Sequence, residues 1–218
     1  MSLGIVMLLI VALGYASNWL NWRFLNYRAT HLLYYIGAFI HEGSHALLCL
    51  ATGAKVQEFK ILSTQPHVTH GGSKLPFIGG ALISAAPIFG GLLFLLFVDH
   101  SLLADHFIIP AFDGSWKDTL WAPLSVLGQF RPWEWQSWVM ALLLLNSGAM
   151  LGPSLQDIKN MWLVLIILFF IKIPFLAEIG LAAAALIAAN ICVQAILIVS
   201  IKLVAMIRKK PTPLDSQS

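Results

Sequence analysis

Long apolar runs, with few polar interruptions, dominate this chain. A helix that crosses the hydrocarbon core of a bilayer needs about 20 mostly apolar residues. Six segments have this pattern and predict membrane-spanning helices at 3–20, 31–52, 75–98, 135–152, 158–176 and 179–207. The last two are almost one run, broken only by Lys172, Pro174 and Glu178. Five spans plus a kinked or re-entrant piece is therefore the competing count.

Two of the connecting segments are more than simple turns. Residues 53–74 place Val56 and Phe59 among polar neighbours and end near Gly71-Gly72, which predicts one or two short strands. Residues 99–134 carry several tryptophans, which are typical of a membrane interface, and we expect an outer cap there. The expected fold class is an all-α polytopic membrane protein with about six transmembrane helices and a short strand-like segment after the second.

Composition and charge exclude other classes of protein. Of the 218 residues, 59% are hydrophobic and 11% are charged, whereas a soluble domain carries roughly 25% charged residues. A formal net charge of +3 with one basic cluster does not fit a nucleic-acid binder. That cluster, at 208–210, predicts a cytoplasmic end for the last helix and, with six spans, both termini in the cytoplasm. We expect one transmembrane domain over 1–210, with its core at 31–160, and a polar tail at 211–218.

The second predicted span contains His41-Glu42-Gly43-Ser44-His45, an HExxH motif. On a helix, residues i and i+4 share a face, so both imidazoles can reach one metal ion. Glu42 lies beside such an ion, where it can accept a proton from a bound water. Ionisable side chains inside a membrane span are costly and usually functional. The motif therefore predicts one Zn²⁺ per chain in preference to a polar seam that only joins helices.

A catalytic zinc site also needs a third protein ligand. The candidates are His31, His67, His70, Asp157 and Glu178. The spans at 31–52 and 135–152 run in the same direction, which brings Asp157 to the side of the histidines and leaves Glu178 on the other side. Gly152-Pro153 is expected to break the helix and let the chain turn back inward. The alternative role for Asp157 is a helix cap.

Three further features bear on substrate binding. His70, in the strand-like segment, is a candidate to bind substrate or to stabilise an oxyanion. Asn146 is polar within the fourth span, where it either joins helices or holds the reacting carbonyl. The third span is rich in small residues, which predicts close helix packing, and Pro87 predicts a kink whose freed backbone groups are available to an extended peptide.

Together, these motifs resemble the site-2 protease family of intramembrane zinc metallopeptidases. The HExxH motif matches fully, Asp157 takes the place of the family's aspartate two helices downstream, and Gly80-Ala81-Leu82-Ile83-Ser84 fits its middle helix. Pro87 stands where a glycine is usual. The resemblance covers about 31–160 and implies a small, divergent member without PDZ or CBS domains. It implies His41, His45 and Asp157 as metal ligands and Glu42 as the general base.

The expected activity is hydrolysis of a peptide bond in or near the transmembrane segment of a membrane-protein substrate. The partners implied are that substrate and the lipid bilayer. Two alternatives come from other classes: a catalytically inactive membrane scaffold of the same fold, and a metal transporter whose buried histidines and aspartate pass ions through the membrane. A glutamate placed for proton transfer beside clustered ligands favours hydrolysis.

Overall fold

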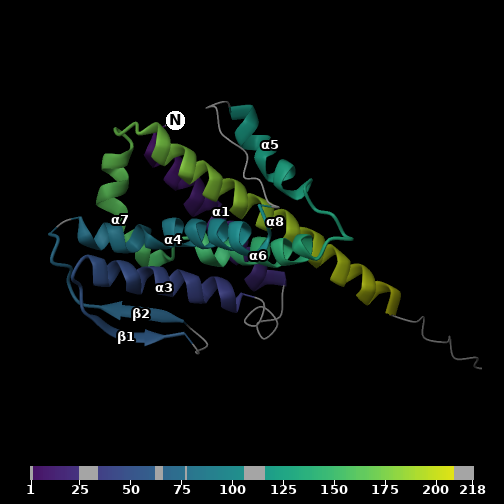
Figure 1. Cartoon of the computed structure of the whole chain (residues 1–218), viewed down its shortest axis with the longest axis horizontal. Coiled ribbons are helices and arrows are strands. Elements are labelled where there is room, and N and C mark those ends of the chain that lie inside the picture. The colour runs from purple at the N-terminus through teal and green to yellow at the C-terminus, as the bar shows by residue number, and fades with distance from the viewer. Residues whose placement is uncertain (1, 25–33, 62–65, 77, 106–115, 209–218) are drawn as a thin grey trace, which may run out of the picture.

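The structure is a computed structural model that describes residues 2–24, 34–61, 66–76, 78–105 and 116–208 (Figure 1). A bundle of helices carries a two-stranded hairpin along one side. Its elements are α1 (Leu3–Phe24), α3 (Tyr35–Ala51), β1 (Val56–Lys60), β2 (His67–His70), α4 (Gly79–Leu102), α5 (Trp116–Leu127), α6 (Trp135–Leu151), α7 (Leu155–Leu168) and α8 (Pro174–Arg208). The candidate ligand His31 and the predicted tail at 211–218 lie outside the described residues.

Three helices in the described part of the chain are long and apolar enough to cross a membrane: α1, α4 and α8. A fourth span is obtained if α6 and α7, which are bent by 47° at a short break, count as one broken span. These helices indicate a membrane protein, but the six-span prediction is not confirmed. The predicted fifth span forms α7, whose 14 residues extend only about 21 Å at 1.5 Å per residue. That length is below the roughly 30 Å of the hydrocarbon core.

The outermost helices of the sequence, α1 and α8, are neighbours that run in the same direction (Figure 1). Val6 lies against Gly180, and farther along both helices the Ser17 hydroxyl donates to Oδ1 of Asn190 over 2.7 Å. If both helices cross fully, the start of α1 and the end of α8 lie on opposite sides of the membrane. This arrangement does not support the expectation that both termini are cytoplasmic, because that expectation required an even number of spans.

The helices that carry the two predicted motifs also run in the same direction, as expected. The Gly37 N–H of α3 donates to Oδ1 of Asn146 in α6 over 2.9 Å, and a turn later His41 meets the carbonyl of Met150. The helix α4, which comes between them in the sequence, packs against both. This parallel pairing brings the end of α6, and with it the chain that follows, to the same level as the histidines.

Close helix packing, predicted from the small residues, is present where α3 meets its neighbours. A Cβ atom added at Gly37 would lie 2.7 Å from the Asn146 carbonyl oxygen, and one at Gly90 would overlap the Ser44 hydroxyl. Glycine is therefore required at both positions for the backbones to approach this closely. The close approach fixes α3, and the histidines on it, against α6 and α4.

The strand-like segment forms a hairpin, as predicted. β1 and β2 pair antiparallel, with Lys60 opposite His67 and Phe59 opposite Val68, and with an irregularity between Val56 and Glu58. Both strands contact α3. The hairpin therefore lies along the helix that carries the HExxH motif (Figure 1).

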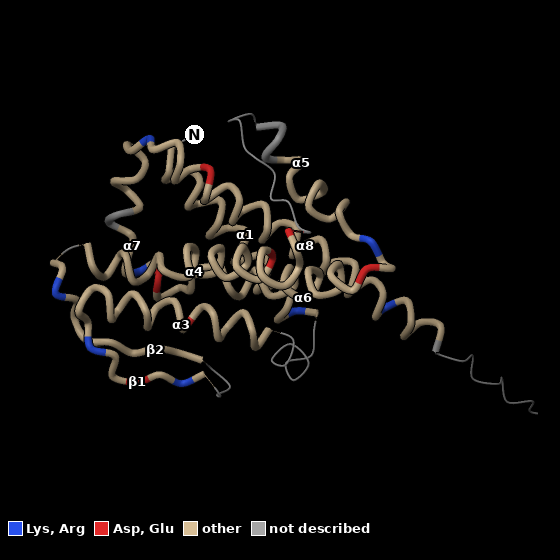
Figure 2. Tube along the Cα trace, in the orientation of Figure 1, with Lys and Arg blue, Asp and Glu red and all other residues tan. Residues whose placement is uncertain are grey.

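Charged residues gather at the helix ends and in the connections, and the helices between them are almost free of charge (Figure 2). The buried core is built mainly from aliphatic side chains of α1, α4, α6 and α8. Many large apolar side chains face outward, including Trp22, Leu93 and Phe170, which are 87%, 67% and 85% exposed. An apolar outer surface over an apolar core is what a lipid environment requires.

A polar seam does join helices in this fold, but it lies between α1 and α8 and not at the HExxH motif. Gln194, which is fully buried, donates to the Ser17 hydroxyl over 2.9 Å and to Asn21 over 3.0 Å. Asn190 donates to the carbonyls of Leu144 and Leu145 in α6. Such hydrogen bonds hold helices together in the absence of a hydrophobic driving force. His41 and His45 of α3 are not part of this polar seam.

Candidate metal centre

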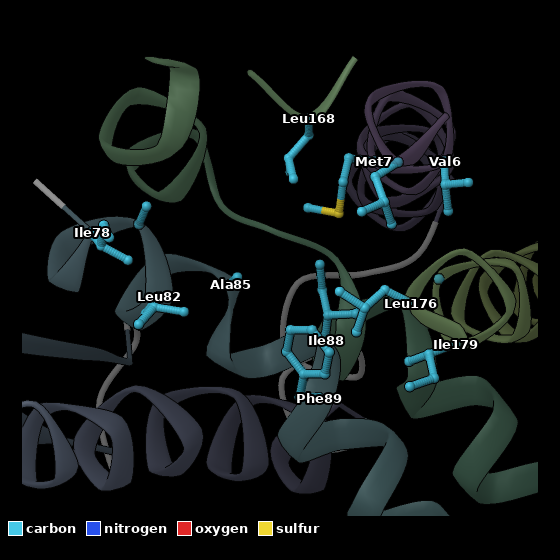
Figure 3. A pocket seen from close by; sticks show the side chains of 13 residues that line it. Val6, Met7, Ile78, Leu82, Ala85, Ile88, Phe89, Leu168, Leu176 and Ile179 are labelled. Atoms are coloured by element: carbon cyan, nitrogen blue, oxygen red, sulfur yellow. The ribbon is translucent and has the colours of Figure 1, made fainter. Parts of the chain in front are cut away.

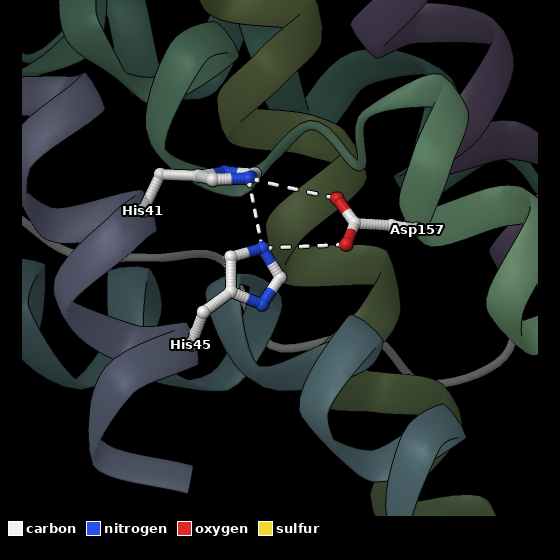
Figure 4. Close-up of side chains that lie close together, drawn as sticks. All are labelled: His41, His45 and Asp157. Atoms are coloured by element: carbon white, nitrogen blue, oxygen red, sulfur yellow. Dashed lines mark hydrogen bonds and ion pairs between the residues drawn. The ribbon is translucent and has the colours of Figure 1, made fainter. Parts of the chain in front are cut away.

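Three buried side chains from α3 and α7 converge on one point (Figure 4). His41 and His45 project from the same face of α3, one helical turn apart, as the i, i+4 spacing predicts. Asp157 comes from the first turn of α7, directly after the break at Gly152-Pro153. The exposed fractions of the three residues are 7%, 8% and 5%. The structure thus brings the expected aspartate to the two histidines.

The distances within this group are short enough for its members to share a metal ion. Nε2 of His41 lies 3.2 Å from Nε2 of His45. Oδ2 of Asp157 lies 3.6 Å from Nε2 of His41, and Oδ1 lies 3.3 Å from Nε2 of His45. One ligand atom from each residue lies within 4.8 Å of the other two, so the three side chains could hold one ion.

Backbone carbonyls set the orientation of both imidazoles. Nδ1 of His45 lies 2.8 Å from the carbonyl oxygen of Ile83 in α4, and Nδ1 of His41 lies 3.3 Å from that of Met150 at the end of α6. A carbonyl can only accept, so each Nδ1 is the protonated nitrogen of its ring. Each Nε2 then carries a free lone pair directed toward the centre of the group. This tautomer is the one that a metal-binding histidine needs.

Asp157 is held in a similar way by Ser154, the N-cap residue of α7. The Ser154 backbone N–H and hydroxyl donate to Oδ2 of Asp157 over 2.8 Å and 2.6 Å, and the hydroxyl accepts from the Asp157 N–H. These reciprocal bonds form a capping box. The two interpretations of Asp157 from the sequence are therefore compatible, because one oxygen completes the helix start while Oδ1 faces His45.

The arrangement leaves a cluster of acceptors without a donor among them. With both Nδ1 atoms protonated, the two Nε2 atoms present lone pairs to each other and to an ionised carboxylate. Lone pairs at these distances repel, and burial makes the repulsion stronger because little water is present to screen it. Only a cation or an added proton at the centre relieves this repulsion. Two imidazoles and one carboxylate form a donor set that could hold a metal ion.

Glu42 follows His41 on α3 and is half-buried. It is not one of the three converging side chains. Its predicted role as a general base stays a prediction. No further group of three such side chains is present in the described part of the chain. The described residues therefore offer one candidate metal centre.

Neither of the other two candidate site residues, Asn146 and His70, is one of the three converging side chains. Asn146 is fully buried, accepts from the Gly37 N–H and donates to the Leu142 carbonyl over 2.8 Å, so both ends of its amide join helix backbones. His70 ends β2, where its Nδ1 lies 2.9 Å from the Gly71 carbonyl oxygen. Their predicted roles in substrate binding stay predictions.

The hairpin carries charged groups of its own. On the exposed face of the pair, Lys60 and then His67 bond to the Glu58 carboxylate. The Lys60 ammonium is the main reason why the pKa of Glu58 lies below its usual value, and His67 lowers that pKa further. The attraction is therefore present at neutral pH and is lost as acid protonates Glu58. The contribution is small, because these groups are solvent-exposed.

A separate cavity of about 180 Å³ lies between α1, α4, α7 and α8 (Figure 3). Its walls are apolar, with Met7, Leu82, Ile88, Leu168 and Leu176 among the residues that line it. It offers no group for acid–base or metal chemistry. The cavity is therefore not a second candidate metal centre.

Sequence reasoning missed the groups that orient the ligands. Ser154 could have been found, because Ser154 and Asp157 have the S-x-x-D spacing that marks a helix start before an apolar run. The carbonyls of Ile83 and Met150 carry no side-chain signature. For Ile83 alone, Pro87 four residues later indicates a carbonyl without its helical partner.

No protein-family model, curated protein or solved structure matches this chain.

Proposed function

We propose that this chain is an intramembrane zinc metalloprotease that hydrolyses a peptide bond in or near the transmembrane segment of a membrane-protein substrate. The observation that carries the proposal is the convergence of three buried side chains, His41, His45 and Asp157, with one ligand atom from each within 4.8 Å of the others. The HExxH sequence and its resemblance to the site-2 protease family support the same function.

The choice of zinc follows from the donor set and its surroundings. Imidazole nitrogens suit zinc better than calcium or magnesium, which prefer oxygen ligands alone. Three protein ligands with one open position are the pattern of catalytic zinc, whereas structural zinc is closed by four. When bound here, zinc supplies a Lewis acid and lowers the pKa of a coordinated water toward about 7.

The roles of the protein groups follow from their positions. His41, His45 and Asp157 bind the ion, while Ile83, Met150 and Ser154 hold them in place. Glu42, next to His41 and half-buried, takes the proton from the attacking water and returns it to the leaving amine. A scaffold would not need this glutamate. In the span that the sequence predicts over 31–52, a charged side chain is costly to keep without a reaction to serve.

The substrate must be unwound at the cleavage site, because a helix shields its carbonyls with its own hydrogen bonds. The hairpin along α3 is suited to receive such an extended segment by adding it to a strand edge. The short β1–β2 hairpin lies beside the helix that carries the HExxH motif, and this position motivates the proposal that it binds the substrate.

The first test is metal content. Wild type, His45→Ala and Asp157→Ala are purified in detergent side by side and their zinc is measured by atomic emission. About one zinc per chain in wild type, lost from both variants, is the expected result. Zinc retained by Asp157→Ala would mean that another group, with His70 first, supplies the third ligand. Absence of zinc from gently purified wild type contradicts the proposal.

A second test separates hydrolysis from the alternatives. Glu42→Gln keeps the ligands, so a protease loses cleavage of an unwound transmembrane peptide and keeps its zinc. A metal transporter of this design loses ion flux into vesicles in the histidine variants without cleaving any peptide. An inactive scaffold binds membrane partners equally well with either residue at position 42.

A further inference from the structure

The carbonyl that orients His45 belongs to the residue four positions before a proline. In an α-helix, the carbonyl of residue i accepts the N–H of residue i+4. Pro87 has no N–H, and its ring pushes away the carbonyl of residue 83. From this relationship we propose that Pro87 is a positioning residue of the metal centre, because it leaves the Ile83 carbonyl free to hold His45 in its metal-binding tautomer. The inference rests on the proposed function.

The Ile83 carbonyl needs a partner as much as His45 does. Ile83 is 1% exposed and lies within α4, which continues as a helix on both sides of Pro87. A buried carbonyl without a donor costs free energy, more so in a membrane where water is scarce. Nδ1 of His45, 2.8 Å away, supplies that donor from the neighbouring helix. The defect in α4 and the ligand on α3 therefore satisfy each other.

The consequence for the metal follows from the two nitrogens of the ring. A proton fixed on Nδ1 leaves Nε2 unprotonated, and Nε2 is the atom that faces His41 and Asp157. If residue 87 carried an N–H, that group would return to the Ile83 carbonyl and compete with His45. The imidazole would then be free to change tautomer and to rotate, and the ligand would be less well prepared for the ion.

At the other two ligands the backbone groups are freed by a helix break and not by a missing N–H. The Met150 carbonyl would accept the Ser154 N–H if α6 continued, but the break at Gly152-Pro153 prevents this. The carbonyl instead meets His41, and the freed Ser154 N–H donates to Asp157 over 2.8 Å. Two proline-associated defects thus supply backbone groups to all three ligands. Pro87 is the better one to test, because its helix remains continuous.

A packing role for Pro87 makes a different prediction. If the ring only shapes α4 so that Gly90 fits against Ser44, any residue that loses the ring disturbs the site equally. If the missing N–H is what matters, a residue without a ring and without an N–H keeps the site intact. Alanine and its ester analogue, lactic acid placed at position 87 by nonsense suppression, differ only in that group.

The experiment compares wild type, Pro87→Ala, the lactic-acid analogue at position 87 and Pro123→Ala. Pro123 lies inside α5 and is the matched control for loss of a helix proline. Zinc affinity is measured by chelator competition, and the His45 tautomer by ¹⁵N NMR of the metal-free protein, with His45→Gln for assignment. Pro87→Ala is expected to lose about tenfold in affinity and to show mixed tautomers. The analogue and Pro123→Ala are expected to match wild type.

Two results overturn the inference. Pro87→Ala with wild-type affinity and an unchanged His45 spectrum shows that the restored N–H does not compete for the carbonyl. An ester analogue as weak as Pro87→Ala shows that the ring, and not the missing N–H, matters. The two proposals fail separately, since the tautomer is read without metal. If wild type binds no zinc, the proposed function falls, while the ¹⁵N spectra still decide whether Pro87 sets the His45 tautomer.

Discussion

The hydroxyl of Ser154 donates to Oδ2 of Asp157 over 2.6 Å and accepts the Asp157 N–H over 3.1 Å. With the backbone N–H of Ser154 also on Oδ2, that oxygen is occupied by two donors. Oδ1, 3.3 Å from Nε2 of His45, is the oxygen left for the metal. A helix cap and a candidate metal ligand are therefore built from the same carboxylate.

Ser154→Ala is expected to weaken zinc binding by about tenfold, the lower end of the range for lost outer-shell partners. The carboxylate loses a donor and gains freedom to rotate, while α7 loses part of its N-cap. Ser154→Thr retains the hydroxyl and serves as the matched control, with affinity near wild type. Chelator competition measures both. Equal zinc affinity for the alanine and threonine variants would show that the cap does not position Asp157.

Glu42→Gln is expected to lower kcat for peptide cleavage by about 10²–10⁴-fold, the usual contribution of general acid–base catalysis. Glutamine has nearly the same shape but cannot accept a proton from water. Zinc content should stay near one per chain, because Glu42 is not among the three ligands. Cleavage rates of a transmembrane peptide and metal analysis on the same sample check both statements. Cleavage at the wild-type rate would remove Glu42 from the mechanism.

Gly37→Ala is expected to destabilise the bundle by about 1–3 kcal/mol, as overpacking does. The new Cβ would lie 2.7 Å from the Asn146 carbonyl oxygen, which belongs to a helix backbone and cannot move aside. Gly43→Ala, on the same helix, meets nothing within 4 Å. It is the matched control and gains helix propensity of up to about 1 kcal/mol. Thermal unfolding in detergent ranks the two, and Gly37→Ala at or above wild type would contradict this packing.

The parallel course of α1 and α8 predicts that the two ends of the chain lie on opposite sides of the membrane. Epitope tags fused to each end should therefore differ in protease sensitivity in sealed vesicles, one digested and the other protected. Vesicles opened with detergent give the control in which both tags are digested. Two tags with the same sensitivity would restore the even number of spans expected from the charge pattern.

Replacing Phe59 of β1 with alanine is expected to raise KM for cleavage several-fold with little change in zinc content. Phe59 is exposed and belongs to the hairpin that we propose to receive the unwound substrate. The hairpin lies beside α3 but supplies no ligand, so the metal centre is unaffected. Steady-state kinetics with a peptide substrate measure the change. An unchanged KM would assign substrate binding to another surface.

Much of the site could be predicted because it depends on helix periodicity and helix direction. The i, i+4 spacing places His41 and His45 on one face whatever the bundle around them. The parallel direction of the two motif-bearing helices selects Asp157 over Glu178. Gly152-Pro153 marks the turn that carries the aspartate inward, and the structure has a 47° bend there.

The span count was harder to predict, because hydropathy measures apolar length and not whether a helix forms over that length. The run at 158–176 is apolar enough for a span, yet α7 ends at Leu168 and α8 begins at Pro174. Proline favours the start of a helix, where its missing N–H is not needed. The roles of the Ile83 and Met150 carbonyls could not be predicted for a different reason. Every residue has a carbonyl, and only the tertiary contacts determine which of them holds a histidine.

The polar seam between α1 and α8 also has a consequence for biosynthesis. Ser17 and Asn190 are 173 residues apart, and Ser17 and Gln194 are 177 apart. The first helix therefore enters the membrane with hydroxyl and amide groups whose partners are translated last. Contacts of such long sequence separation form late and slowly. A nascent chain halted before α8 would contain His41, His45 and Asp157 but would lack the helix that packs against α1 and α6. Addition of α8 is therefore the event that completes the fold.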